Sequence, residues 1–132
     1  MASRDWDWFR QAERDLQQAE LSFKAGHHDW ACFACHQAAE KAVEALHLSL
    51  GQEAWERVVS RLLRELSERI EVPEQPVDKA RVLDAYYIPT RYPNGHPAGA
   101  PYEHYGALQS QEATRYAREI LAFARDQMAW RR

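Results

Sequence analysis

The sequence has little glycine, few β-branched residues and no excess of basic side chains. Five glycines stand among 132 residues, whereas Ala, Leu, Glu, Arg and Gln are abundant. Strong helix formers with little glycine favour α-helices over a β-sheet. The chain is 45% hydrophobic and 28% charged, which is typical of a folded domain and not of a disordered segment. Its length suits one core, so we expect a single domain over residues 1–132.

The lack of a basic excess limits the kind of partner that the chain can bind. The net charge is −3 with the histidines neutral. Proteins that bind nucleic acid without sequence preference usually carry a surplus of Lys and Arg. If this chain binds RNA, the contact must be a local basic patch or one assembled by dimerisation.

Long hydrophobic runs are also missing. No stretch reaches the roughly 18 apolar residues of a candidate transmembrane helix. The N-terminal stretch "MASRDWDWFRQAERD" has no apolar core of the kind found in signal peptides. We therefore expect no membrane association and a cytoplasmic location.

Only two cysteines are present, three positions apart in a helical pattern, so they cannot form the disulfide framework of a small secreted protein. With His36, Cys32 and Cys35 spell the C-x-x-C-H pattern of covalent haem attachment. His28, Cys32 and Cys35 also share a helix face next to His27, a set of zinc-binding residue types. No export signal and no second Cys/His pair support either site. We expect Cys32 and Cys35 to be small core residues, with no metal or other cofactor, and leave a further role open.

Apolar spacing predicts five helical segments. They cover Ser3–Lys24, Asp29–Leu50, Ala54–Ile70, Val77–Tyr87 and Ala107–Trp130. Ser3 and Asp29 are expected caps, Gly26 and Gly51 are expected stops, and Trp55 begins the apolar stripe of the third segment.

The second segment is rich in alanine and apolar on most sides, which is typical of a helix in the middle of a bundle. Short connections between most segments favour antiparallel neighbours. The predicted fold is therefore all-α: an up-and-down bundle of four to five helices, with a long Pro/Gly-rich loop before the last helix.

That loop contains the stretch "RYPNGHPAGAPYEH", which begins at Arg91. Prolines at every fourth position, Pro89, Pro93, Pro97 and Pro101, exclude a helix there. Ordered loops of roughly 18 residues tend to be functional. Proline also fixes backbone angles in the unfolded chain, so ordering this loop costs less entropy.

Arg91 and His96 form an R-x4-H pair inside this loop. Arginine can hold a phosphate with two parallel donors, and histidine can exchange a proton near neutral pH. Aromatic rings provide faces on which unpaired bases stack. The tyrosines around the pair are Tyr86, Tyr87, Tyr92, Tyr102 and Tyr105. These residue types suit metal-free RNA cleavage, in which Arg91 stabilises charge on the phosphate. In the alternative interpretation, Arg91 bonds the last carbonyls of the fourth helix and His96 is a solvated loop residue.

Two stretches resemble the HEPN family, whose name stands for higher eukaryotes and prokaryotes nucleotide-binding. "HDWACFACHQAAEKAVEALHLSLG" resembles its second helix, and "DAYYIPTRYPNG" resembles the end of the penultimate helix in a prokaryotic branch. The order of helices is also similar over nearly the whole chain.

The resemblance implies a function as well as a fold. Active members are metal-independent endoribonucleases with an R-x4-6-H motif, and they act as dimers. Many are toxins encoded beside a minimal nucleotidyltransferase that acts as antitoxin. By this resemblance Arg91 and His96 are catalytic, and Asn94 fills a polar position between them.

Tyr92, Tyr102 and Arg81 are the further residues that we expect to bind RNA or nucleotide. Two copies of Arg81 and Arg91 around one cleft of a homodimer would concentrate positive potential there. The alternative is a non-catalytic protein that binds nucleotide or serves as a scaffold for a nucleotidyltransferase. A purely structural dimer is a third interpretation.

Overall fold

The structure is a computed structural model that describes residues 3–54 and 56–130. It contains five α-helices: α1 (Asp5–Lys24), α2 (His28–Ser49), α3 (Val59–Glu65), α4 (Glu74–Asp84) and α5 (Ala107–Trp130). Three short 3-10 helices complete the described part: η1 (Leu66–Glu68), η2 (Pro93–Gly95) and η3 (Pro101–Glu103). No residue within the described ranges is in a strand, so the predicted all-α class is confirmed.

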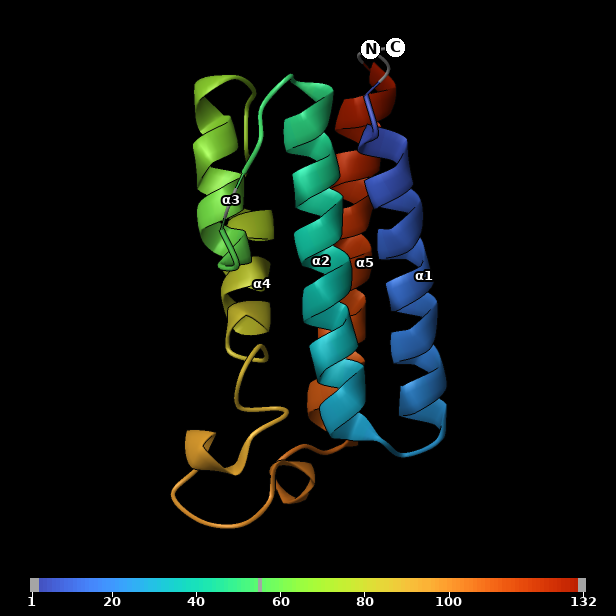
Figure 1. Cartoon of the computed structure of the whole chain (residues 1–132), viewed down its shortest axis with the longest axis vertical. Helices are drawn as coiled ribbons and strands as arrows, with labels where there is room; N and C mark the ends of the chain where they lie inside the picture. The colour runs from blue at the N-terminus through green and yellow to red at the C-terminus, as the bar shows by residue number, and fades with distance from the viewer. Residues whose placement is uncertain (1–2, 55, 131–132) are drawn as a thin grey trace.

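Helix α2 lies at the centre of the bundle (Figure 1). It packs against α1, α5, α3 and α4. The long helices α1 and α5 lie on one side of α2, and the shorter pair α3 and α4 lies on the other. Both ends of the described chain lie at one end of the molecule, and the loop with η2 and η3 lies at the opposite end.

Small side chains allow α2 to occupy this central position. Its buried small residues are Ala31, Cys32, Ala34, Cys35, Ala38, Ala39, Ala42 and Ala45. They let neighbouring backbones approach closely, while larger side chains such as Phe9, Leu62 and Ile120 fill the remaining space. The predicted bundle arrangement is confirmed.

Both cysteines are free and fully buried in this core. Burial is the main cause that raises the pKa of each thiol, Cys32 and Cys35, to about 12. The thiols are therefore neutral at ordinary pH, and neither is poised as a nucleophile. Cys35 contacts the hydroxyl of Thr114 on α5 at 3.6 Å.

The third helix is shorter than predicted at both ends, because it begins at Val59 and not at Ala54, and it ends at Glu65 and not at Ile70. Val58 is extended, and its amide donates to the Glu56 carboxylate at 3.1 Å. The Asp84 carboxylate, from the end of α4, accepts the first helical amide at 2.6 Å. A side chain distant in sequence thus fixes where α3 starts. Trp55, the first residue of the predicted stripe, lies outside the described residues.

The other boundaries differ less from the prediction. Helix α4 spans Glu74–Asp84 instead of residues 77–87. It can start earlier than predicted because a proline is tolerated in the first turn of a helix, where the amide that proline lacks would have no helical partner. Asp29 lies in the first turn of α2 and is not its cap. The expected stops at Gly26 and Gly51 both have positive φ angles, 80° and 75°. Helix α5 has the predicted bounds.

Candidate functional site

The loop between α4 and α5 is folded back on itself by side-chain bonds to its own backbone. His96 Nε2 lies 2.6 Å from the carbonyl oxygen of Pro89, and His104 Nε2 lies 2.6 Å from that of Ala98. Buried Thr90 donates its hydroxyl to the Tyr86 carbonyl at 2.6 Å. The loop is therefore ordered, as its prolines predict, although it contains only short 3-10 turns.

A close backbone approach also holds His96 in place. A β-carbon at Gly95 would lie 2.9 Å from the Cα of Pro89, a separation that real β-carbons essentially never show. The lack of a side chain at Gly95 lets η2 lie against Pro89, whose carbonyl accepts from the His96 ring.

The guanidinium of Arg91 lies among aromatic rings. Its Nε donates to the Tyr87 carbonyl at 2.9 Å. The Cζ atom lies 4.2 Å from the ring centre of Phe33, 4.8 Å from that of Tyr87 and 5.2 Å from that of Tyr92. The two terminal nitrogens have no hydrogen bond or ion pair to any residue that the structure describes. Arg91 thus presents a fixed, unneutralised cation whose terminal nitrogens remain available to donate hydrogen bonds.

The hydrogen bond of His96 determines which ring nitrogen can accept a proton. A carbonyl oxygen only accepts, so Nε2 carries the hydrogen and donates it to Pro89. In the neutral ring Nδ1 is then the basic nitrogen. The ring is stacked on His104 with centres 4.1 Å apart and planes at 1°, and it meets the edge of Tyr105 at 5.7 Å.

Arg91 and His96 are anchored to the same turn but have different neighbours. Their side chains bond the carbonyls of Tyr87 and Pro89. The guanidinium lies against Phe33 of α2, whereas the imidazole stacks on His104 within the loop. No hydrogen bond joins the two side chains in the described part of one chain. The alternative interpretation has Arg91 bond the last carbonyls of the fourth helix; the bond in fact goes to Tyr87, which is inside the predicted helix but lies beyond the end of α4 at Asp84.

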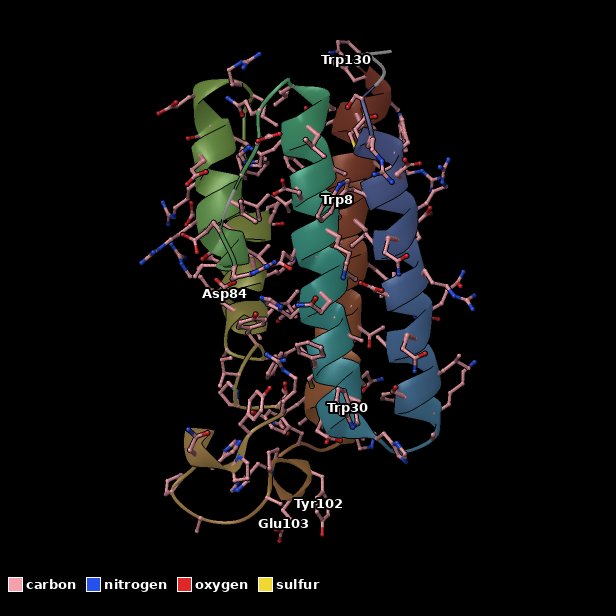
Figure 2. The ribbon with its side chains drawn as sticks, in the orientation of Figure 1. Trp8, Trp30, Asp84, Tyr102, Glu103 and Trp130 are labelled. Atoms are coloured by element: carbon pink, nitrogen blue, oxygen red, sulfur yellow. The ribbon has the colours of Figure 1, made fainter. Side chains whose placement is uncertain are left out.

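The remaining sequence-predicted residues are spread over the loop end and α4. Asn94 is exposed in η2, Tyr92 is 49% exposed, and Tyr102 on η3 is 70% exposed at the tip of the molecule (Figure 2). Arg81 is bound to Glu74 and Asp78, so its charge is neutralised within α4. The structure therefore leaves Arg91, and not Arg81, as the unpaired cation beside the tyrosines.

Sequence reasoning missed the contribution of α2 to this site. Three residues of α2 lie near the loop: Trp30, Phe33 and His36. Their spacing, which puts them on one side of the helix, is the only feature of the sequence that indicates a shared site. His36 is fully buried, with its ring centre 5.1 Å from that of Tyr87. Its Nε2 lies 3.1 Å from the Arg57 carbonyl, and its Nδ1 lies 3.2 Å from the Gln37 amide nitrogen. Burial lowers the pKa of His36, and the Arg91 charge adds a smaller effect in the same direction.

A groove between α1 and α2 adjoins the aromatic residues. Its volume is about 510 Å³, and Trp30 and Phe33 form part of its wall. Its other lining residues are Asp15, Gln18, Ser22, His27, Ala34, Gln37 and Lys41. Lys41 pairs with Asp15 at 2.5 Å, so the charges inside the groove largely cancel.

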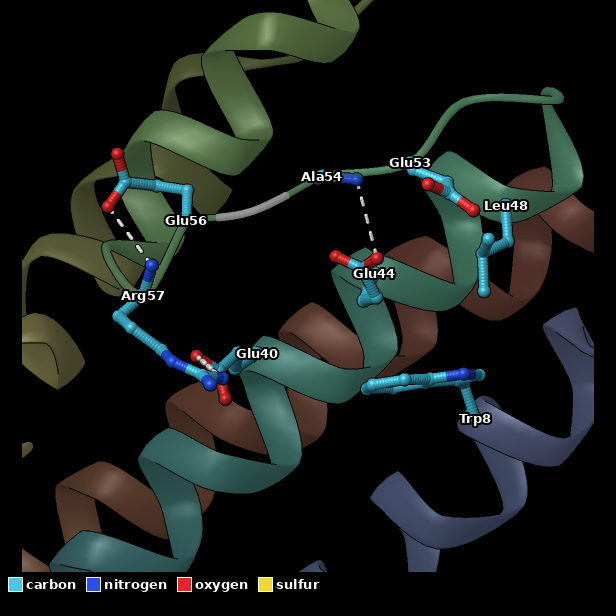
Figure 3. Close-up of a pocket in the computed structure, with 8 residues that line it drawn as sticks. All are labelled: Trp8, Glu40, Glu44, Leu48, Glu53, Ala54, Glu56 and Arg57. Atoms are coloured by element: carbon cyan, nitrogen blue, oxygen red, sulfur yellow. Dashed lines mark hydrogen bonds and ion pairs between the residues drawn. The ribbon is translucent and has the colours of Figure 1, made fainter.

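A second pocket, of about 290 Å³, is strongly acidic (Figure 3). Trp8 of α1 and Leu48 of α2 lie along one side of it. Its charged residues are Glu40, Glu44, Glu53, Glu56 and Arg57. Arg57 bonds the buried Glu40 at 3.2 Å, and burial is the main cause that raises the pKa of Glu44. The carboxylates here would repel a phosphate, so this pocket is not part of the Arg91 site.

The residues of the zinc and haem patterns make other contacts in the structure. His28 bonds the Ser110 hydroxyl at 2.7 Å, while Cys32 and Cys35 point into the core. Over residues 3–54 and 56–130, no three His, Cys, Asp or Glu side chains come together in a way that could hold a metal ion. Within the same ranges, none of the helices has the length and apolarity to cross a membrane.

Comparison with known proteins adds independent findings. The HEPN domain family model matches residues 6–127. A protein of Thermus thermophilus of known crystal structure is 48% identical, with a TM-score of 0.93 over 96% of this chain and 99% of that chain. An archaeal HEPN homologue is 36% identical, with a TM-score of 0.82 over 96% and 99%. A HEPN domain protein of Thermotoga maritima is 35% identical, with a TM-score of 0.77 over 93% and 98%. No curated protein matches the chain.

Proposed function

The chain belongs to the HEPN domain family, and from that premise we propose that it is a metal-independent endoribonuclease that acts as a homodimer. The family includes ribonuclease toxins, and HEPN domains commonly dimerise. The observation that carries the proposal is the unneutralised Arg91 guanidinium, fixed beside aromatic faces on the same loop as a histidine with a basic Nδ1.

The geometry supports a division of roles between the two side chains. Arg91 has two terminal nitrogens available for the oxygens of a scissile phosphate, which a guanidinium can hold with two parallel hydrogen bonds. His96 can take the proton of a ribose 2′-hydroxyl at Nδ1, because Nε2 is held by Pro89.

The proposed reaction is an internal transfer. The 2′ oxygen attacks phosphorus as His96 removes its proton, and the bond from phosphorus to the 5′ oxygen breaks. Arg91 stabilises the charge that builds on the phosphate oxygens. The departing 5′ oxygen takes a proton from water, which leaves a 2′,3′-cyclic phosphate and a 5′-hydroxyl.

The different neighbours of the two groups within one chain support a cleft that is shared between two copies. Arg91 lies against α2 and His96 lies within the loop stack, with no hydrogen bond between them. In our proposal the Arg91 of one copy and the His96 of the other act on the same phosphate. The protein would be the cytoplasmic toxin of a two-gene module, with a minimal nucleotidyltransferase as its antitoxin.

The first prediction concerns cleavage of a mixed RNA pool by the purified protein in the presence of a metal chelator. The parent protein should cut, and the new ends should carry a 5′-hydroxyl. Arg91→Ala and His96→Gln should each slow cutting by about a hundredfold or more. Glutamine keeps a donor that can reach the Pro89 carbonyl, so His96→Gln tests proton transfer and not only loop folding.

Arg115→Ala is the matched control, because Arg115 is an exposed arginine on α5 that lies against Tyr116. It should cut as well as the parent. If Arg91→Ala and His96→Gln also cut at the parent rate, the assignment of both residues is wrong.

The second candidate function is nucleotide binding without cleavage. It is favoured by the same observation that Arg91 and His96 have different neighbours within one chain. An intact RNA pool together with a clear calorimetric signal for ATP would support this candidate over the nuclease. If the parent protein binds ATP and Arg91→Ala does not, the phosphate of the nucleotide would be placed at the same guanidinium.

A further inference from the structure

Trp30 begins a row of aromatic rings that leads to Arg91. It lies at the loop end of α2 and is 52% exposed (Figure 2). Its ring meets Phe33 edge-on, with centres 6.1 Å apart and planes at 80°. Phe33 in turn lies 6.3 Å from Tyr87 at 27°, and it carries the Arg91 guanidinium at 4.2 Å. One ring, Phe33, therefore contacts both the exposed tryptophan and the unpaired cation.

The same two aromatic residues border the groove between α1 and α2. Beyond Trp30 and Phe33 the groove wall carries the amide of Gln37, which donates to His36 and accepts from Lys41 at 3.4 Å. Because Lys41 is paired with Asp15, the groove offers the apolar faces of Trp30 and Phe33 and little net charge. These are the surfaces that an unpaired base prefers, while the free cation next to them suits its phosphate.

We propose that Trp30, together with Phe33 and the α1–α2 groove, forms a base-stacking subsite for an unpaired nucleotide whose phosphate lies on Arg91. This inference rests on the proposed function, because it assumes that single-stranded RNA is the ligand. It adds α2 residues to a site that the sequence placed on the loop and on the fourth helical segment. Trp30 is assigned to binding and takes no part in the bond-breaking step.

The second prediction uses a probe that the proposed reaction cannot cut. The probe is a fluorescently labelled single-stranded oligonucleotide of mixed sequence with 2′-O-methyl groups, which has no free 2′-hydroxyl. Fluorescence anisotropy gives its affinity for the parent protein and for each variant. Trp30→Ala should bind about five- to 150-fold more weakly, the range found when one base–aromatic stack is removed. Trp30→Phe keeps a stacking face and should restore most of the affinity.

The salt dependence of binding separates stacking from charge. Trp30→Ala removes no phosphate contact, so the slope of log affinity against log salt should stay at the parent value. Arg91→Ala should lower the size of that slope by about one. Trp130→Ala is the matched control, because Trp130 is 84% exposed at the opposite end of the molecule and should leave affinity unchanged.

Each result has a distinct meaning for the two proposals. If the parent binds the probe and Trp30→Ala binds as tightly as Trp130→Ala, the subsite is wrong while the nuclease proposal stands. If the parent neither binds the probe nor cuts RNA, both proposals fall. If Trp30→Ala loses the dimer in analytical ultracentrifugation, this face contacts a second copy and the subsite is also wrong.

Discussion

At the scale of single residues, His36 links the site to the stability of the whole bundle. It is fully buried on α2, and burial is the first cause of its lowered pKa. The Arg57 carbonyl and the carboxylates of Glu40 and Asp84 act in the opposite direction, and Arg91 lowers the pKa further. The native ring is therefore neutral at pH values where an unfolded histidine already takes up a proton.

The third prediction is a loss of stability in acid that depends on His36. At pH values well above 6.5, its ordinary pKa, the ring is neutral in both the folded and the unfolded chain, so it adds no pH dependence. Below that pH the unfolded chain binds the proton first, and the free energy of unfolding falls until the lowered native pKa is reached. One such proton contributes a slope of at most about 1.4 kcal/mol per pH unit.

Urea titrations at several pH values between 7 and 5 measure this slope, with His36→Gln as the comparison. Glutamine keeps a donor toward the Arg57 carbonyl but does not titrate, so its stability should fall less steeply. Equal slopes for the parent and His36→Gln would mean that other groups cause the acid sensitivity.

At the scale of elements, the loop between α4 and α5 depends on one close contact. A β-carbon at Gly95 would press on the backbone of Pro89, which cannot move aside as a flexible side chain can. The displaced segment carries the carbonyl that holds His96 Nε2. We therefore expect the position of His96, and not the helical bundle, to respond to a methyl group at Gly95.

The fourth prediction follows from this contact. Gly95→Ala should reduce RNA cleavage about tenfold or more if His96 is catalytic as proposed, because a small displacement of a catalytic group is costly. Circular dichroism should show an unchanged helical content, since the strain falls on a loop. Gly106→Ala is the control, because a β-carbon there meets no atom within 4 Å. Equal activity in the two variants would show that the contact between Gly95 and Pro89 does not position His96.

The elements also show how far the sequence predicts this structure. Helix α5 has its predicted bounds because apolar spacing along one stripe is a local signal. The start of α3 could not be predicted in this way, because Asp84 fixes it from the end of another helix. The loop pattern named Arg91 and His96 as candidates. That Phe33 lies under the guanidinium depends on how α2 packs, which no spacing within the loop reveals.

At the scale of the whole molecule, charge and geometry both bear on our proposal of two copies around one RNA strand. The chain is negative overall, and its acidic pocket lies away from the loop. Positive potential must therefore be concentrated locally, and two Arg91 side chains around one cleft would do so. Since Arg91 and His96 of one chain have different neighbours, a complete site in our proposal takes one group from each copy.

The fifth prediction tests this arrangement by mixing two inactive variants. In a heterodimer of Arg91→Ala and His96→Gln, one site combines the intact His96 of the first chain with the intact Arg91 of the second. The other site has neither group. Random exchange of subunits should then restore roughly a quarter of the parent activity, because half of the dimers carry one complete site out of two. If each chain instead uses its own pair, every site in the mixture lacks one group. The mixture would then stay as inactive as the separate variants, although sedimentation would still show dimers.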